Sequence, residues 1–396
     1  MANIATNNPD HPLLSPITAA LATVDDPEIR KPITELGMVE RVDIDPAGAV
    51  FVRVLLTIAG CPLKGPIQRD VTAAVAAVAG VTDVQVELGV MSEEQRAELR
   101  RSLNGGRAER DIPFARPDSL TRVILVASGK GGVGKSSVTV NLAMALSQAG
   151  HTVGVLDADI YGHSIPAMLG VADARPTSIG DDQESMILPV PTNGLQVMSI
   201  GMLKPERSQV VAWRGPILDR ALTQMLADVH WADPDFLIVD MPPGTGDVQI
   251  SLGQKMPNAE VIVVTTPQAA AAEVAERAGT MASMMNQKVI GVVENMAYLE
   301  VMCPHCEESH RVDVFGSGGG QEVADVLTQR LGYDIGLMGQ IPLDPEVRSG
   351  GDEGSPVVVT APHHPSAMAL REMADQVSER KRSLVGMRLG LTPTGQ

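Results

Sequence analysis

The stretch SGKGGVGKSS, residues 128–137, decides the fold of this chain of 396 residues. It follows the apolar run VILVAS at 123–128 and precedes a helical pattern over 136–148. The spacing G-x-x-x-x-G-K-[ST] is met by Gly129, Gly134, Lys135 and Ser136. A strand, a glycine-rich loop and a helix in this order predict a phosphate-binding loop.

Each residue type in this loop has a chemical reason. Glycines let backbone N–H groups turn inward around phosphate oxygens, and the start of the helix adds about half a positive charge. Lys135 brings a full charge to the β- and γ-phosphates, and the Ser136 hydroxyl can ligate Mg²⁺. We therefore predict an ATPase whose contacts to ATP and Mg²⁺ come from Gly129, Lys130, Gly131, Gly132, Val133, Gly134, Lys135, Ser136 and Ser137.

Lys130 is an additional cation at the start of the loop. It lies too far round the loop to serve the β-phosphate of its own nucleotide easily. We expect it to reach the nucleotide of a partner chain across a two-fold axis. The alternative is an ordinary solvated loop lysine.

Carboxylates at the ends of apolar strands complete the predicted nucleotide site. Asp240 ends FLIVD (236–240) and is the candidate second-sphere carboxylate for Mg²⁺. Gly244 follows it and can offer an amide to the γ-phosphate. The run TVGVLD leads into D-A-D, where Asp159 is the candidate that orients the attacking water and Asp157 is a metal-shell or capping residue. One such carboxylate is often only a helix cap, but three at one phosphate site favour catalysis.

Seven short apolar runs alternate with longer helical stretches after Arg122. They are 123–128, 152–157, 195–200, 236–240, 261–266, 289–295 and 335–341. A strand that is apolar on both faces is buried on both faces. The pattern predicts an α/β fold with a mostly parallel sheet and helices on both of its faces, preceded by a small α/β domain.

Changes in composition predict five segments. These are a flexible N-terminus (1–12), a small α/β domain (13–95), a linker (96–121), the ATPase domain (122–380) and a flexible tail (381–396). Within the small domain the pattern predicts helices at 17–24 and 66–78 and strands at 50–58 and 81–86. The linker is predicted because it has six Arg, two Pro and few apolar residues.

The overall composition excludes several classes of protein. A net charge of −17 disfavours a DNA-coating role, and only nine residues are Phe, Tyr or Trp (4, 3 and 2), which disfavours a base-stacking surface. The N-terminal sequence lacks the basic and apolar regions of a signal peptide, and no apolar run approaches the roughly 20 residues of a membrane helix. We therefore expect a cytoplasmic protein with no nucleic-acid or membrane partner.

A C-x-x-C motif, Cys303 to Cys306, follows the run that ends at 295. Two thiolates are half of the four ligands that a zinc or [4Fe–4S] site needs. A symmetric dimer would supply the other two. A zinc site within one chain using His305 and His310, a redox dithiol and an inert pair are the alternatives.

Taken together, these motifs resemble the Mrp/ApbC family of iron–sulfur cluster carrier ATPases. That family belongs to the deviant P-loop class with MinD, ParA and the nitrogenase iron protein. The resemblance rests on GKGGVGKSS, DADIYG (157–162), WRGP (213–216), DMPPGTGD (240–247), ENM (294–296), CPHC (303–306), FGSGGG (315–320) and IPLDP (341–345). Residues 13–95 resemble the small domain found in iron–sulfur assembly proteins.

The resemblance implies roles for residues of the nucleotide site. It implies a homodimer that sandwiches two nucleotides, with Lys130 acting on the partner's nucleotide as a catalytic residue beside Lys135. Asp159 resembles the water-positioning carboxylate, Asn295 would read the adenine edge, and Pro342 would lie near that base.

The resemblance also assigns the cysteines. Cys303 and Cys306 would bind a [4Fe–4S] cluster that bridges two chains, and Cys61 matches a Cys-Pro of the small domain that would assist transfer or be an ordinary buried thiol. Apo iron–sulfur proteins and cluster scaffold proteins would be the partners. His163 replaces a common Pro and Glu307 a common Gly, and the loop ends in Ser136-Ser137 instead of Ser-Thr, which leaves the shapes of the loops at 163 and 307 open.

The sequence therefore predicts an ATP-dependent carrier of a [4Fe–4S] cluster. Two alternatives share its motifs. A MinD/ParA-like positioning ATPase would need a membrane-binding or DNA-binding element, for which the tail from Arg380 is the only candidate. An ATP-driven electron donor like the nitrogenase iron protein would have its bridging cysteines far apart in sequence, unlike Cys303 and Cys306.

Overall fold

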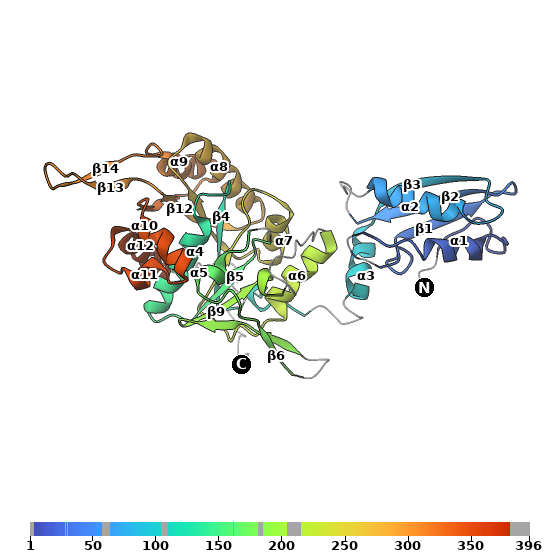
Figure 1. The fold of residues 1–396 in the computed structure, drawn as a ribbon, viewed down its shortest axis with the longest axis horizontal. Coiled ribbons are helices and arrows are strands. Elements are labelled where there is room, and N and C mark those ends of the chain that lie inside the picture. The colour runs from blue at the N-terminus through green and yellow to red at the C-terminus, as the bar shows by residue number, and fades with distance from the viewer. Residues whose placement is uncertain are drawn as a thin grey trace, which may run out of the picture. The chain divides into compact units, whose positions relative to one another are not determined.

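The apolar runs form the centre of an eight-stranded sheet (Figure 1). The computed structural model describes residues 4–27, 29, 31–57, 64–103, 110–116, 118–160, 162–180, 185–203 and 215–380. The chain divides into two compact units, Met1–Arg110 with Ala212–Arg220 and Asp111–Val211 with Ala221–Gln396.

The first unit has a three-stranded sheet in the order β1-β2-β3. Its elements are α1 (Leu14–Leu21), β1 (Val39–Ile44), β2 (Ala49–Leu56), α2 (Lys64–Ala76), β3 (Asp83–Val90) and α3 (Glu93–Leu103). β1 is antiparallel to β2, and β2 is parallel to β3, with α2 as the crossover. Val50, Val52 and Val54 alternate along β2 and are buried, so one face of the sheet carries the core.

The structure of this unit differs from the expectations in four details. The first helix begins at Leu14 instead of residue 17, and β1 was not expected. α3 occupies Glu93–Leu103, so the first part of the predicted linker is helical. This helix is rich in charged residues and poor in apolar ones, which gives it the composition of a linker. The segment 1–12 is not wholly loose, since the Ala5 N–H donates to the Glu40 carbonyl and Asn7 bonds the backbone of Ile44.

The second unit contains the eight-stranded sheet, in the order β15-β12-β11-β4-β10-β5-β9-β8. Its strands are β4 (Arg122–Ser128), β5 (Val153–Asp157), β8 (Val190–Thr192), β9 (Leu195–Ser199), β10 (Phe236–Asp240), β11 (Glu260–Thr265), β12 (Lys288–Asn295) and β15 (Leu337–Ile341). All pairs are parallel except β8 with β9. The predicted α/β fold with a mostly parallel sheet is confirmed.

Helices cover both faces of this sheet (Figure 1). The helices are α4 (Lys135–Gln148), α5 (Ile165–Met168), α6 (Gly215–Ala227, with residues in both units), α7 (Asp247–Lys255), α8 (Ala269–Met284), α9 (Gly319–Leu331), α10 (Pro345–Glu353), α11 (Val357–Thr360) and α12 (Pro365–Glu379), with short 3₁₀ turns at Pro113–Ala115 and Ile200–Leu203. Ile124 and Val126 of β4 pack in the cluster that includes α4 and α12. Leu125 and Ala127 of β4 contact the side of α8. Both faces of the strand are buried, as its unbroken apolar sequence predicts.

Two small hairpins were not expected. β6 (Thr177–Ile179) pairs with β7 (Met186–Leu188), and β13 (Leu299–Met302) pairs with β14 (Ser309–Val312), both antiparallel. The β13–β14 hairpin extends away from the body of its unit (Figure 1). Both hairpins are largely exposed, so their strands lack the long apolar runs by which buried strands are recognised.

Candidate functional site

The glycine-rich loop joins the end of β4 to the start of α4, as predicted. Gly132 and Gly134 have φ of +82° and +80°, which L side chains rarely adopt. A Cβ on Gly129 would lie 2.3 Å from the backbone of Val274 in α8, so only glycine fits there. The loop is therefore held in one shape by close packing, with the N-terminus of α4 at its end.

Lys135 and Asp240 form the centre of the site. The Lys135 Nζ lies 2.7 Å from Asp240 Oδ2 and 3.9 Å from Asp159 Oδ2. Asp240 is fully buried and also accepts hydrogen bonds from the hydroxyls of Ser136 and Thr139, both at 2.7 Å. The Lys135 ammonium therefore lies among hydroxyl and carboxylate oxygens, in a position that a metal cation could take. Oxygen donors of this kind are those that Mg²⁺ prefers, so the residues fit that ion.

Asp157 differs from its two neighbours because its charge is disfavoured. It is fully buried beside Asp240, its partner in the β5–β10 register. Burial, followed by the negative charge of Asp240, raises the pKa of Asp157 to about 8. Its oxygens accept hydrogen bonds from the Asp159 N–H and the Ser199 hydroxyl. Of the two roles expected for Asp157, these contacts favour capping the turn over ligating a metal.

Asp159 faces the phosphate loop from the turn after β5. Its Oδ1 accepts a hydrogen bond from the Gly162 N–H at 3.0 Å, while Oδ2 lies on the Lys135 side. The side chain is 11% exposed, which leaves it at the edge of the site and within reach of a water. This position suits the predicted role of orienting a nucleophile.

Two predicted phosphate contacts are used otherwise in this structure. The Gly244 N–H donates to the Ser128 carbonyl at 2.9 Å, so it would have to leave this carbonyl to reach a γ-phosphate. Lys130 Nζ donates to Gln268 Oε1 of the same chain at 3.0 Å. Val133 is buried, and the Ser137 carbonyl accepts a hydrogen bond from the side-chain amide of Asn141 at 2.9 Å. A Cβ on Gly131 would lie 4.0 Å from Pro243.

Asn295 and Pro342 lie together where two parallel strands end. Asn295 pairs with Ile341 in the β12–β15 register, and Pro342 follows directly and is buried. The side-chain amide of Asn295 donates to the Val133 carbonyl at 2.9 Å. One of the two N–H donors of this amide is therefore used by the phosphate loop, which leaves its second N–H and its oxygen for an adenine edge. A Cβ on Gly134 would lie 2.1 Å from the same amide, which explains the glycine.

The two cysteines lie in the loop of the β13–β14 hairpin. The Cys303 N–H donates to the Glu308 carbonyl and the Glu307 N–H to the Cys303 carbonyl, both at 2.9 Å. Hydrogen bonds from the backbone N–H groups of Cys306 and His305, and from the Cys306 thiol, lower the pKa of the Cys303 thiol. Cys306 is exposed and Cys303 half-buried. The loop therefore favours a thiolate that is open to metals.

The sequence departures at 163 and 307 have structural explanations. Glu307 has a φ of +60°, in the left-handed region that glycine adopts freely and other residues at a cost. The ring of His163 lies where a Cβ on Gly201 would be, so that glycine accommodates the larger side chain. Neither change removes a residue of the predicted site.

Some functional contacts were missed from the sequence. Thr139 lies one turn after Lys135 on α4, so its position at i+4 could have placed it on the Asp240 side. Gln268 and Ser199 have no local sequence signal, because only the tertiary fold brings them to Lys130 and Asp157. Cys61, the first part of WRGP and the tail from residue 381 lie outside the described residues.

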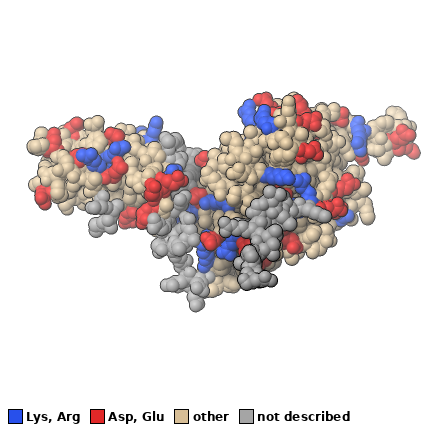
Figure 2. Space-filling model, turned by 180° about the vertical axis from the view of Figure 1, so that it is seen from behind, with Lys and Arg blue, Asp and Glu red and all other residues tan. Residues whose placement is uncertain are grey.

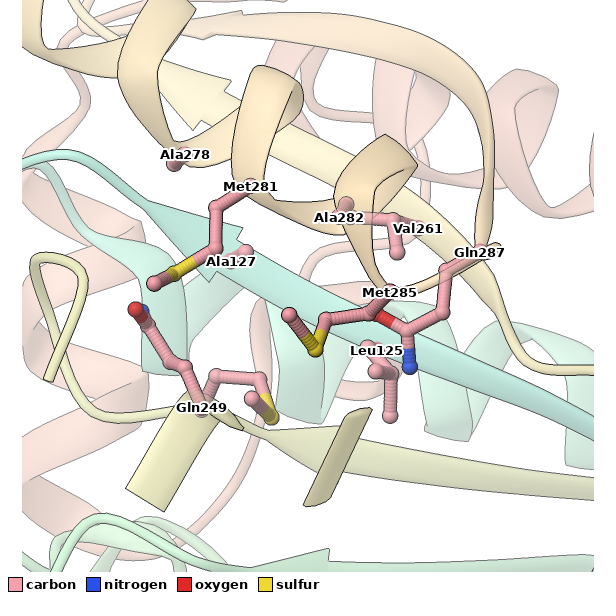
Figure 3. A pocket seen from close by; sticks show the side chains of 10 residues that line it. Leu125, Ala127, Gln249, Val261, Ala278, Met281, Ala282, Met285 and Gln287 are labelled. Atoms are coloured by element: carbon pink, nitrogen blue, oxygen red, sulfur yellow. The ribbon is translucent and has the colours of Figure 1, made fainter. Parts of the chain in front are cut away.

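A Met-lined pocket is separate from these groups (Figure 3). It lies between β4 and β11 on one side and α8 on the other, with Met281 and Met285 on its wall. Gln249 points into it, bonds the Pro242 carbonyl through Nε2 and has a buried Oε1 without a partner. The pocket has no ionisable lining residue, and we assign it no chemistry.

The surface has no simple pattern of charge on the face drawn in Figure 2. Lys and Arg occur there in small groups among Asp and Glu, and acidic side chains gather at the far end of the protruding hairpin. Among the described helices, none has the length and hydropathy needed to cross a bilayer.

Comparisons with known proteins agree over most of the chain. Residues 119–378 match the ParA model described as NUBPL iron-transfer P-loop NTPase, and residues 15–88 match the model of iron-sulfur cluster assembly protein. An "Iron-sulfur cluster carrier protein" of Mycobacterium bovis is 54% identical over 385 residues, covering 97% of this chain and 98% of that protein. The protein of the same name from Deinococcus radiodurans is 42% identical over 368 residues, covering 92% and 95%.

Among solved structures, one similar protein is a nucleotide-binding protein from Archaeoglobus fulgidus in complex with ADP. It is 34% identical, covers 61% of this chain and 92% of its own, and superposes with a TM-score of 0.49.

Proposed function

Because this chain belongs to the ParA family of NUBPL iron-transfer P-loop NTPases, we propose that it is an ATP-dependent iron–sulfur cluster carrier. Two copies bind one [4Fe–4S] cluster through Cys303 and Cys306 of each chain and transfer it to apo-proteins. Cluster scaffold proteins supply it, and the protein works in the cytoplasm, where thiols stay reduced.

The arrangement of Cys303 and Cys306 carries this proposal. Their Sγ atoms lie within 4.8 Å of each other on an exposed hairpin. Two thiolates from one chain leave a four-iron cluster half-ligated, and a second copy related by a two-fold axis completes it. The cluster is the cargo of this reaction and is released to the recipient.

The surface around the cysteines supports a second copy as the partner. Val301, Met302, Val312 and Val314 are 40%, 65%, 46% and 48% exposed on the same hairpin. Exposed apolar groups that gather on one element mark a contact surface. A two-fold axis at the hairpin would cover these side chains and bring the sulfur pairs together.

The nucleotide site supplies the energy for a change in this dimer. Lys135 leaves its place beside Asp240 to contact the β- and γ-phosphates when ATP binds. Ser136 would ligate Mg²⁺, with Asp240 as its second-sphere carboxylate, and the ion would neutralise charge on the phosphates. Asp159 orients the attacking water, and Lys130 of each chain contacts the nucleotide of the other, where its charge stabilises the transition state.

Anaerobic reconstitution with Fe²⁺ and sulfide tests this function. The wild-type chain should take up one cluster per two chains, measured by iron, sulfide and light scattering. The Cys303→Ala/Cys306→Ala variant should take up none, while Ser309→Ala in the same hairpin should load normally. Equal uptake by the double variant would overturn the proposal.

A transfer assay separates this function from its rivals. The loaded dimer should pass its cluster to an apo iron–sulfur enzyme, restoring that enzyme's activity. Retention of the cluster with a reversible, ATP-sensitive potential would instead indicate an electron donor. ATP-dependent sedimentation with liposomes that requires the tail would indicate a positioning ATPase.

A further inference from the structure

The loop of the β13–β14 hairpin contains a third metal-ligating side chain that cluster bridging does not require. One donor atom each of Cys303, Cys306 and His310 lies within 4.8 Å of the others. The Cys306 Sγ and His310 Nε2 are 3.1 Å apart. Within the described part of the chain, no other group of His, Cys, Asp and Glu side chains converges in this way.

Backbone pairing places His310 next to the thiols. His310 is opposite Val301 in the hairpin register, one pair from the end of the ladder. The hydrogen bond from the Cys303 N–H to the Glu308 carbonyl then closes the loop that carries both cysteines. The three donors are therefore fixed relative to one another by the hairpin and need no second chain.

The distances suit a single ion. Bonds of about 2.3 Å to sulfur and 2.0–2.1 Å to nitrogen place the donors of a tetrahedral zinc site about 3.5–3.8 Å apart. Small side-chain rotations bring the three donors from their present separations to these values. Two thiolates and one imidazole leave the fourth position open, as in sites of the Cys₂His type.

The charge around the loop favours a cation. Glu307 and Glu308 are exposed beside the cysteines, and acidic side chains gather at the far end of the hairpin in Figure 2. Neighbouring carboxylates attract a divalent ion by their charge. They do not displace the thiolates, because a thiophilic ion prefers sulfur ligands to oxygen.

We propose that one chain alone binds one thiophilic divalent cation, Zn²⁺ or Fe²⁺, through Cys303, Cys306 and His310. Binding releases the two thiol protons and leaves one coordination position for an external ligand. The inference rests on the proposed function, because a bridged cluster uses the same two thiolates. The one-chain state and the cluster-bridged dimer therefore exclude each other, and the ion must leave before the cluster is shared.

Titration of the full, metal-free chain with Co²⁺ under anaerobic conditions tests this site. The wild type should bind one Co²⁺ per chain as a monomer. It should develop thiolate-to-cobalt absorption in the near ultraviolet and the strong visible bands of tetrahedral cobalt. His310→Ala should weaken Co²⁺ binding at least about tenfold. Loss of a residue that only supports a metal ligand already lowers the affinity about 10–100-fold, and loss of a ligand should cost no less.

Matched variants separate ligation from damage to the hairpin. His305→Ala removes the neighbouring imidazole and should bind Co²⁺ like the wild type. His310→Cys should restore one Co²⁺ per chain with stronger thiolate absorption, which a folding defect would not do. Unchanged affinity and visible bands in His310→Ala, or one Co²⁺ per two chains in the wild type, would overturn the proposal.

Cluster reconstitution on the same proteins distinguishes the two proposals. If the wild type binds one Co²⁺ per chain but never takes up a bridged cluster, the carrier function fails and the one-chain site stands. If His310→Ala takes up both Co²⁺ and the cluster like the wild type, the one-chain site fails and the carrier function stands.

Discussion

The Lys130 ammonium donates a hydrogen bond to the side-chain oxygen of Gln268 in the same chain, at 3.0 Å. Gln268 is the residue before α8, and its side chain does not cap that helix. The carbonyl of Lys130 also accepts a hydrogen bond from Ser128. If Lys130 acts on the nucleotide of a partner, this contact must break when the dimer forms.

Replacing Gln268 should shift the monomer–dimer equilibrium. Gln268→Ala removes the acceptor without removing a helix cap, so free Lys130 should favour the ATP-bound dimer. A hydrogen bond to a charged group contributes about 1.5–3 kcal/mol, and solvent at this half-buried site reduces it to about 1 kcal/mol. Because the contact must break in both chains, the two contributions add to about 2 kcal/mol, and we expect dimerisation about 30-fold tighter, measured by sedimentation velocity with a non-hydrolysable ATP analogue.

Gln268→Glu is the matched variant for this prediction. A carboxylate at the same place should hold Lys130 more strongly, so dimerisation should weaken. A shift of both variants in the same direction would show that Gln268 affects the dimer by another route.

Asp159→Asn should separate ATP binding from ATP hydrolysis. The amide oxygen can still accept the Gly162 N–H, so the turn should keep its shape. The negative charge that orients water is lost, and turnover should fall by about 10²-fold or more. Nucleotide affinity should change little, as measured by calorimetry beside a phosphate-release assay. Equal losses of affinity and turnover would instead assign Asp159 to binding.

The stability of the nucleotide-free chain should fall as pH rises from about 4 to about 8. Burial and the charge of Asp240 raise the pKa of Asp157 to about 8, so the folded state keeps a proton that the unfolded state releases above about pH 4. The stability from this proton is complete below the unfolded pKa, declines as pH rises, and is gone once the folded pKa is passed. Asp157→Asn mimics the neutral acid and should flatten the fall in melting temperature between about pH 5 and pH 8.

Asp235 provides a control of opposite sign. Hydrogen bonds from the backbone N–H and the hydroxyl of Thr152 lower the pKa of Asp235. Its contribution is present above the unfolded pKa and lost as pH falls through the folded value. Asp235→Asn should therefore change only the acidic side of the stability profile. An effect of this variant between about pH 5 and pH 8 would contradict the assignment of the fall in that range to Asp157.

The core of the nucleotide site could be predicted because its signals are local. The loop at 129–134 needs glycine at the positions with positive φ and at the position where the backbone of α8 lies too close for a Cβ. The spacing of these glycines can be read directly from the sequence. Strands such as β10 are apolar on both faces and end in the carboxylate that the site uses. Since parallel strands end at one edge of the sheet, Asp157 and Asp240 were expected at the same edge, and the pairing of β5 with β10 makes them direct neighbours.

Contacts between distant segments could not be predicted in this way. Gln268 meets Lys130 across 138 positions, and nothing near either residue indicates the contact. The hairpin strands at 299–302 and 309–312 are short and exposed, so burial leaves no period-2 pattern in them. The third donor, His310, was one of two candidate histidines until the hairpin register placed it beside Cys306.

Glu307→Gly should stabilise the hairpin itself. Glu307 has a φ of +60°, which costs a residue with a side chain about 1 kcal/mol relative to glycine. The loop has this φ without a metal, so the replacement stabilises the free and the bound states alike, and the Co²⁺ affinity should stay within about twofold of the wild type. Glu307→Val should destabilise the hairpin because a β-branched residue tolerates this region poorly. Hydrogen exchange of the hairpin amides measures the stability, and competition with a chelator of known affinity measures the binding. A large change of affinity in Glu307→Gly would show that the loop changes its conformation when the metal binds.

Met302→Glu should prevent the cluster-bridged dimer while leaving the one-chain metal site intact. Met302 is 65% exposed and immediately precedes Cys303, so a two-fold axis that joins the sulfur pairs would cover it in both chains. Burying a methionine contributes about 1.5–3 kcal/mol, whereas a buried, unpaired carboxylate is costly. Light scattering after reconstitution should show monomers, with Co²⁺ still bound once per chain. Met368→Glu, at a methionine that is 51% exposed on α12, should dimerise like the wild type. A dimer that forms normally with Met302→Glu would mean that the chains approach each other through a surface other than the hairpin.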